Sequence, residues 1–299
     1  MRICQTEMQP FINILETVSS ELTQLPQTVR VTLECVPNLP ITETVNCLDT
    51  ADSQRCSADR YWIPWTEELG AWVNASGSDV VLVVNQASEV IEISGALTLG
   101  LTSVIAGACL NLQGQVAIHA NAIALEELAV AFVGYSGMGK STLSAYCASR
   151  GAGFITDDVL VVDLENLVHP GNPRLKLYPH TGESLGLDAS KETDYKIFYK
   201  PQQLGAKLQR QPVPIGIIYL LAESSDESIY SLPLSPSQAV FELLTHSYYT
   251  SALIPSNPSL LDAYVRLVAE APVRQLFYPR DFATLPKVYD FLLAEIHHL

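Results

Sequence analysis

The sequence has six cysteines but no CxxC pair, and none of its histidines lies at zinc-ligand spacing from them. The usual sequence patterns of a structural zinc site are therefore excluded. Cys109 and Cys147 lie in apolar or helical contexts, where a thiol behaves as a small hydrophobe. Cys47 and Cys56 form the one close pair, in a polar stretch that permits either a bridge or two free thiols. This cysteine usage fits a reducing, cytoplasmic location best.

Basic residues are scarce, with 17 Lys and Arg against 32 Asp and Glu and a net charge of −15. This balance argues against a general affinity for nucleic acid or for an anionic membrane, because both need clustered cations. Seven of the 17 basic residues nevertheless fall between positions 174 and 210. That stretch is either a solvated loop region or a surface that meets phosphate or an acidic substrate.

Long apolar runs are also rare. The first ten residues lack the apolar run of a signal peptide behind a basic start. The run 93–112 has no charge over 20 residues, which is long enough to cross a bilayer. It carries several Ser, Thr, Asn and Gly residues and has no close basic flanks, which favours a buried helix over a membrane span. The sequence contains no internal repeat and no low-complexity tract.

A hydrophobic fraction of 48% is enough for a packed core in a chain of 299 residues. Short β-branched runs at 29–36, 79–85 and 89–94 predict a β-rich region over 1–92, and 46–60 is a polar loop. Tyr61-Trp62-Ile63-Pro64-Trp65 is either a binding surface or, as we favour, a plug between domains. From 93 onward, strands are expected at 115–125 and 128–133, joined by a tight turn at Glu126-Glu127, and at 154–155, 159–162, 215–222 and 273–278. Helices are expected at 140–150, 236–246, 258–271 and 281–299. Segment 166–212 is the least regular, and the whole predicts an α/β core over 93–299.

One motif carries a specific chemistry. Gly134-Tyr-Ser-Gly-Met-Gly139-Lys140-Ser141 fits the pattern of a phosphate-binding P-loop at every defined position. Successive backbone N–H groups must converge on phosphate oxygens, and side chains at the glycines would obstruct that approach. Lys140 would reach the β- and γ-phosphates of ATP, and Ser141 would bind Mg²⁺. The whole predicted nucleotide-binding segment comprises Gly134, Tyr135, Ser136, Gly137, Met138, Gly139, Lys140, Ser141 and Thr142.

Two further features accompany the loop. Asp157 and Asp158 follow Lys140 by 17 and 18 residues, between two strand-like runs. Such a pair can supply a Mg²⁺ ligand and a base or positioning carboxylate, although it would otherwise be an ordinary exposed turn. His119 lies 15 residues before Gly134, on the strand antiparallel to the one that enters the loop. It is either a hydrogen-bonded core residue or a residue that lies beside the phosphate-binding end of that neighbouring strand.

The segments 119–124, 132–142 and 151–159 together resemble the catalytic domain of HPr serine kinase/phosphorylase, a phosphoenolpyruvate-carboxykinase-like P-loop fold. They are more similar still to HPr-kinase-like peptide serine kinases, some encoded beside lasso-peptide genes. The resemblance covers about 95–295 and includes 168–177, 212–219 and 271–281. It implies a mixed-sheet kinase core followed by C-terminal helices.

By this resemblance, Ser141 and Asp157 serve the metal, Asp158 takes the proton of the acceptor hydroxyl, and His119 lies by the transferring phosphate. The division of roles between the two aspartates is the less firmly implied part. Arg174, Lys176 and Lys200 are candidate contacts for phosphate or acceptor, and Glu183 is a candidate metal-side acid. Relatives of this fold often assemble, so a homo-oligomer is left open.

The sequence departs from the family in one place. The Leu-Glu-Ile-Arg-Gly-Leu-Gly type segment expected after the aspartate pair is absent, and 180–187 is a poor match. HPr is therefore not the default acceptor, nor is a phosphorylase back-reaction implied. The function expected is an ATP- and Mg²⁺-dependent kinase acting on a hydroxyl of a peptide or small metabolite. The alternatives are a nucleotide-binding regulatory module and a simple ATPase or GTPase, although no guanine-reading motif is present.

Overall fold

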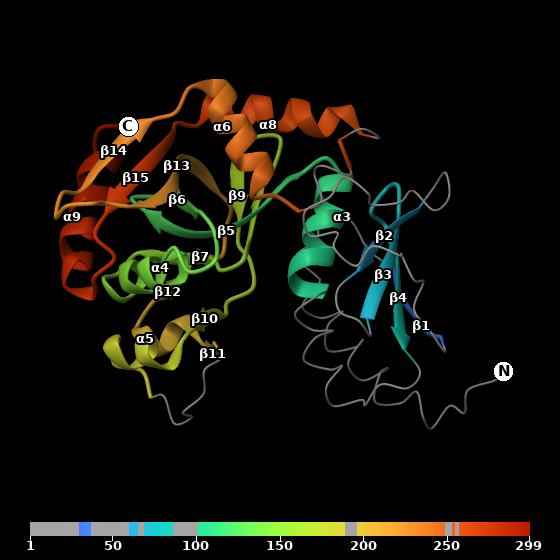
Figure 1. Cartoon of the computed structure of the whole chain (residues 1–299), viewed down its shortest axis with the longest axis horizontal. Helices are drawn as coiled ribbons and strands as arrows, with labels where there is room; N and C mark the ends of the chain where they lie inside the picture. Colours follow the sequence, from blue (N-terminus) through green and yellow to red (C-terminus); the bar gives the residue numbers. More distant parts are fainter. Residues whose placement is uncertain are drawn as a thin grey trace. The chain divides into compact units, whose positions relative to one another are not determined.

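The computed structural model describes residues 30–36, 60–64, 69–85, 101–188, 196–248, 253–254 and 257–299. Two compact units make up the chain, one of Met1–Gly114 with Tyr248–Leu260 and one of Gln115–Ser247 with Leu261–Leu299 (Figure 1). The segment 93–112, expected to begin the second domain, clusters with the first unit. The expected strand at 89–94, most of the loop at 46–60 with Cys47 and Cys56, and Trp65 lie outside the described residues.

The first unit contains a four-stranded sheet. Its strands run in the order β1 (Arg30–Val36), β4 (Asp79–Asn85), β3 (Leu69–Asn74) and β2 (Arg60–Pro64), with β1 parallel to β4 and the other pairs antiparallel. The strands expected at 29–36 and 79–85 are confirmed. In β2, Tyr61, Trp62 and Ile63 are buried, and the ring of Trp62 packs on Trp72 with centroids 4.9 Å apart.

The described part of the apolar run 93–112 is helical. It forms a π-helical turn, η2 (Leu101–Ile105), followed by α3 (Ala106–Leu112), whose residues are all buried. The Asn111 amide is satisfied within the same unit because it donates to the carbonyl of Tyr248 at 2.8 Å. The expectation of a buried helix is confirmed for 105–112. Among the described residues no helix is long and apolar enough to cross a membrane.

The second unit is a mixed α/β fold around a nine-stranded sheet. Seven of its strands pair as neighbours in the order β12 (Lys207–Leu208), β7 (Gly153–Thr156), β5 (Val116–Leu125), β6 (Leu128–Val133), β13 (Val213–Glu223), β15 (Val273–Tyr278) and β14 (Tyr230–Pro233). The parallel pairs are β12 with β7, β6 with β13, and β13 with β15. β8 (Val159–Val162) and β9 (Leu167–His169) bridge the beginnings of β5 and β13. Of the paired strands here, β14 is one that the sequence pattern had not indicated.

The β5–β6 hairpin turns through Glu126 and Glu127, both with positive φ, of 50° and 68°. Two successive left-handed residues form the turn whose twist matches that of the flanking strands. The predicted tight turn is confirmed, and it fixes the register of the hairpin so that Ala120 lies opposite Val133.

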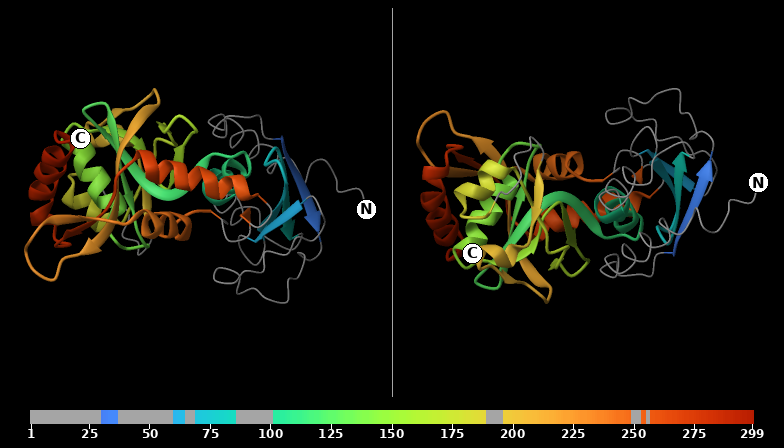
Figure 2. Two further views of the ribbon diagram at one scale, coloured as in Figure 1. Left: turned by 90° about the horizontal axis from the view of Figure 1, so that it is seen from above. Right: turned by 90° about the horizontal axis from the view of Figure 1, so that it is seen from below.

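Helices cover both faces of this sheet. α4 (Lys140–Ser149) and α9 (Leu285–Ile296) pack with β6, β13 and β15 around one core cluster, and they lie side by side in both views of Figure 2. α6 (Pro236–Thr245) and α8 (Pro258–Glu270) lie on the other side of the sheet from α4 in Figure 1. The helices expected at 140–150, 236–246 and 258–271 are confirmed. The one expected at 281–299 begins as a 3-10 turn, η4 (Phe282–Thr284), and continues as α9.

The stretch expected to be least regular consists of short elements. They are β9, β10 (Leu175–Leu177), α5 (Pro179–Ser184), β11 (Ile197–Tyr199), η3 (Pro201–Leu204) and β12. β10 pairs with β11, and their apolar residues join Ala145 and Ala148 of α4 in a second small core. This packing holds β10 and β11 against α4.

Phe132 is the large aromatic side chain at the centre of the main core, and it is fully buried in β6. Phe132→Ala should lower the free energy of unfolding by about 3–5 kcal/mol, because it removes buried apolar surface and leaves a cavity. Denaturant unfolding monitored by circular dichroism measures this. The matched control is Phe241→Ala on α6, where the residue is 69% exposed and a change within about 0.5 kcal/mol is expected. Equal losses in the two variants would contradict this assignment of the core.

Candidate active site

The glycine loop lies between β6 and α4, as the motif requires. Its Gly134, Gly137 and Gly139 all have positive φ, of 155°, 85° and 90°. Glycine is also required sterically at 139, because a Cβ there would lie 2.8 Å from the hydroxyl oxygen of Tyr278. The chain enters α4 at Lys140, so the first N–H groups of the helix and those of the loop face the same space. This geometry is the one that binds an anion at a helix N-terminus.

Two donors at and just after the end of β15, Tyr278 and Arg280, hold the loop, and both line the same cavity. The Tyr278 hydroxyl donates to the carbonyl of Met138 at 3.3 Å, and the Arg280 guanidinium donates to the carbonyl of Gly137. Arg280 also lies 3.6 Å from a carboxylate oxygen of Glu223. These two hydrogen bonds fix the orientation of two peptide groups of the loop. Within the loop, the N–H of Met138 donates to the carbonyl of Tyr135 at 3.2 Å.

Lys140 is buried and folds back on the loop. Its Nζ donates to the carbonyl of Gly134 and, at 3.3 Å, to that of Tyr135. Burial lowers the pKa of Lys140 to about 8, and the nearby carboxylate of Asp158 partly opposes this effect. A partly desolvated ammonium group on weak neutral acceptors is poised to exchange them for an anion.

The buried carboxylate of Asp157 joins three segments. Its Oδ1 accepts hydrogen bonds from Ser141 Oγ, at 3.0 Å, and from Asn121 Nδ2, and its Oδ2 accepts from the backbone N–H of Lys176 at 2.7 Å. Burial raises the pKa of Asp157 to about 6, with Asp158 adding to the effect, although the three donors act in the opposite direction. Among the described residues, the buried Asn121 Oδ1 has no hydrogen-bond partner.

Asp158 faces the cavity beside His119. Its φ of 83° is left-handed, which is unusual for a residue other than glycine and is tolerated best by Asp and Asn. Its Oδ1 lies 3.8 Å from His119 Nδ1, and its backbone carbonyl accepts from the N–H of Ala120 at 3.1 Å. Partial burial and the charge of Lys140 lower the pKa of His119, so its imidazole is neutral at pH 7. The backbone of His119 is fixed by its N–H bond to the carbonyl of His246 at 2.8 Å.

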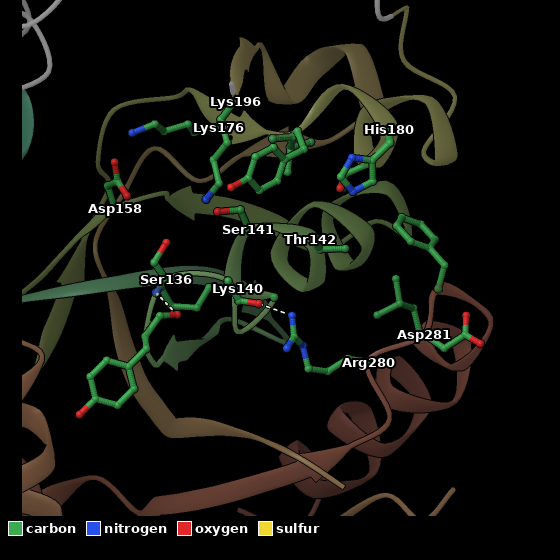
Figure 3. A pocket seen from close by; sticks show the side chains of 18 of the residues that line it. Ser136, Lys140, Ser141, Thr142, Asp158, Lys176, His180, Lys196, Arg280 and Asp281 are labelled. Atoms are coloured by element: carbon green, nitrogen blue, oxygen red, sulfur yellow. Dashed lines mark hydrogen bonds between the residues drawn. The ribbon is translucent and has the colours of Figure 1, made fainter. Parts of the chain in front are cut away.

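These groups line one cavity of about 430 Å³. Figure 3 shows Asp158 and Lys176 at one end, Lys140 and Ser141 in the middle, and Arg280 and Asp281 at the other end. Of the predicted nucleotide-binding residues, Tyr135, Ser136, Gly137, Gly139, Lys140, Ser141 and Thr142 line it, whereas Met138 packs against the core. The predicted catalytic residues His119 and Asp158 also line it, and Asp157 lies behind Ser141.

Of the four candidate substrate residues, one lines the cavity and three do not. Lys176 lines the cavity from β10, as does the next residue, Leu177. Three others are not among the lining residues. Arg174 lies over the ring of Phe198, 5.9 Å from its centroid, Glu183 is exposed on α5, and the exposed Lys200 begins η3.

Several residues at the site were not selected from the sequence. Asn121 had a signal, because it is a polar residue at a buried position of an otherwise apolar strand. Lys196 lies in the basic stretch 174–210 and Arg280 in the segment 271–281, but neither was chosen individually, since each reaches the cavity from a loop whose course no local pattern predicts. Tyr278 was expected only as the last residue of a strand.

No protein-family model matches this chain, and no curated protein matches it. Among solved structures, it is similar to that of the Hpr(Ser) kinase/phosphatase from Coxiella burnetii, with 13% sequence identity and a TM-score of 0.33. The similar region covers 61% of this chain and 95% of that one.

Asp157→Asn should flatten the dependence of stability on pH. The folded-state pKa of about 6 lies above the ordinary value of 3.8, so the folded protein holds an extra proton between these pH values. The free energy of unfolding therefore falls as pH rises through this window, at about 1.4 kcal/mol for each unit of pKa difference. The variant lacks this titration and should lose less stability between pH 4 and pH 7.

Denaturant titrations of both proteins at pH 4, 5, 6 and 7 measure the slopes. A uniform loss of stability from the altered hydrogen bonds does not affect this comparison. Asp290→Asn, at an exposed position on α9, serves as the control and should keep the slope of the unmodified protein. Equal slopes for the protein and for Asp157→Asn would show that burial does not raise the pKa of this carboxyl.

Proposed function

We propose that this protein is a kinase that transfers the γ-phosphoryl group of ATP to a hydroxyl, with Mg²⁺ as cofactor. One observation carries the proposal. A glycine loop at the start of a helix, a buried lysine and Asp158 line one cavity, and the buried Asp157 contacts that cavity's Ser141. A nucleotide sensor needs the loop and the lysine, but it has no need of a carboxylate held in a left-handed conformation at the same cavity.

Binding of the triphosphate would use groups that are already oriented. The loop and the first turn of α4 line the cavity, and Tyr278 and Arg280 hold the carbonyls of Met138 and Gly137 in place. Lys140 would leave the carbonyls of Gly134 and Tyr135 for the β- and γ-phosphate oxygens. That exchange replaces neutral acceptors with charged ones, which form stronger hydrogen bonds.

The residues around Asp157 fit a magnesium ion. Mg²⁺ prefers oxygen ligands, and Ser141 Oγ and Asp157 Oδ1 lie 3.0 Å apart at the start of α4. Burial raises the pKa of Asp157 because it disfavours the charged carboxylate. A bound cation would stabilise the charged form, so Asp157 is suited to be a metal ligand. When bound, the ion would neutralise charge on the β- and γ-phosphate oxygens.

Asp158 is the proposed base. The acceptor oxygen would form a bond to the γ-phosphorus while the bond from that phosphorus to the β–γ bridging oxygen breaks, and ADP leaves. The proton of the acceptor hydroxyl would pass to the Asp158 carboxylate. Neutral His119, 3.8 Å away, can donate a hydrogen bond at this point without adding charge. The acceptor is a serine of a peptide or a hydroxyl of a small metabolite.

The direct test is incubation with γ-labelled ATP, Mg²⁺ and a panel of hydroxyl-bearing peptides and metabolites. Label transferred to an acceptor supports the kinase. Tight ATP binding without turnover would instead indicate a regulatory module, and release of labelled phosphate regardless of acceptor would indicate an ATPase.

Asp158→Asn should separate binding from chemistry. Asn tolerates the left-handed backbone, so the fold and the affinity for ATP should persist. The transfer rate should fall by about 100-fold or more, which is the usual contribution of a positioned base. Single-turnover transfer and equilibrium binding measure the two effects, with Asp290→Asn as the control that changes neither. Full transfer activity in a folded Asp158→Asn protein would show that Asp158 is not the base.

Lys140→Met should separate function from stability. Removing the ammonium should weaken ATP binding by about 10- to 100-fold, the value of one or two hydrogen bonds to a charged group. The unfolding temperature should stay equal or rise, because the lowered pKa of Lys140 means that its buried charge costs stability at pH 7. Calorimetric binding and thermal unfolding test both parts. Lys287→Met on the exposed side of α9 is the control, and unchanged ATP affinity in Lys140→Met would contradict the assignment.

A further inference from the structure

The residues that line the cavity change from charged and polar at one end to aromatic and aliphatic at the other. Around Lys140 and Ser141 it is lined by charged side chains and by polar backbone of the loop. Beyond Thr142 the lining includes aromatic and aliphatic side chains from two segments far apart in the sequence. These are Leu177, Tyr178 and His180 from β10 and α5, and Phe282 and Leu285 from η4 and α9.

We propose that this second end binds the base of the nucleotide, with Phe282 on one wall and Tyr178 with His180 on the other. This inference rests on the proposed function, because it assigns the part of ATP that the glycine loop does not hold. Its ligand is a planar purine ring, which gains affinity by stacking on aromatic side chains and by leaving water.

The Phe282 wall is held rigidly. Its partly buried ring packs against the core cluster that includes Tyr278 and Leu285. The turn that carries it is capped by Asp281, whose Oδ1 accepts from the N–H of Ala283 at 3.0 Å. A ring fixed in this way loses little conformational entropy when a ligand packs on it.

The facing wall is already a stacked pair. The rings of Tyr178 and His180 have centroids 5.6 Å apart and an interplanar angle of 17°. The ammonium of Lys196 lies 5.3 Å from the centroid of the Tyr178 ring. Tyr178 is 40% exposed and lines the cavity, so its ring is accessible to a ligand there.

The order of residues along the cavity indicates that the aromatic end holds the nucleotide base and that the acceptor binds at the other end. Figure 3 shows Thr142 between His180 and Asp281, while Asp158 lies at the opposite side beyond Lys140 and Ser141. If the terminal phosphoryl group is transferred beside Asp158, the remainder of the nucleotide must extend the other way along the start of α4. The acceptor then approaches from the Asp158 end.

The test compares two ligands that differ in the nucleoside, ATP and inorganic tripolyphosphate, each with Mg²⁺. Phe282→Leu keeps an apolar side chain against the core but removes the aromatic face, and Tyr178→Leu does the same on the exposed wall. Each variant should bind ATP about tenfold more weakly, the typical loss for one stacked base, and bind tripolyphosphate as the unmodified protein does. Phe241→Leu on α6 removes an exposed ring that does not line the cavity and should change neither affinity.

Calorimetry or competition with a fluorescent nucleotide gives both dissociation constants, and unchanged thermal unfolding shows that each variant is folded. Equal losses for ATP and tripolyphosphate, or no loss for either, would overturn the assignment of the base while leaving the kinase proposal intact. If the unmodified protein binds neither ligand, the proposed function fails and this inference fails with it.

Discussion

The buried carboxylate of Asp157 is the group on which the geometry of the site depends. It accepts hydrogen bonds from Ser141 at the start of α4, from Asn121 in β5 and from the backbone of Lys176 in β10. One side chain therefore fixes the first turn of the helix against a central strand and against the short β10–β11 pair. Burial raises the pKa of Asp157 to about 6, so this anion is held at an electrostatic cost. A site that binds a cation at Asp157 and Ser141 would offset that cost.

The position of Asp157 determines what its neighbours can do. Asp158 follows in a left-handed conformation that directs it to the cavity and to His119. Lys140, one residue before Ser141, is buried with a pKa lowered to about 8, the opposite perturbation to that of Asp157. Groups of opposite charge that are both destabilised by burial in one cavity are typical of binding sites, where a ligand supplies the missing partner. Tyr278 and Arg280 complete the arrangement by donating hydrogen bonds to the loop carbonyls of Met138 and Gly137.

Local patterns predicted the parts of the site that lie on a single continuous segment. The strand, loop and helix over 128–149 were predictable because apolar alternation, glycine spacing and a helical run each leave a local signal. The hairpin register that brings His119 beside the loop followed from the tight turn at Glu126 and Glu127. Contacts between segments left weaker signals or none. Arg280 and Lys196 reach the cavity from loops, and of the basic residues chosen at 174, 176 and 200, Lys176 alone lines it. Edge strand β14 escaped detection because its residues are mostly exposed and do not alternate.

The most direct test of the account is a crystal structure with a non-hydrolysable ATP analogue and Mg²⁺. The account predicts that the analogue occupies the cavity with its terminal phosphate between Lys140 and Asp158. It also predicts that the Lys140 ammonium has moved from the carbonyls of Gly134 and Tyr135 to phosphate oxygens, and that the metal contacts Ser141 and Asp157. An analogue bound outside this cavity, or a Lys140 that still donates to the loop carbonyls in the complex, would contradict it.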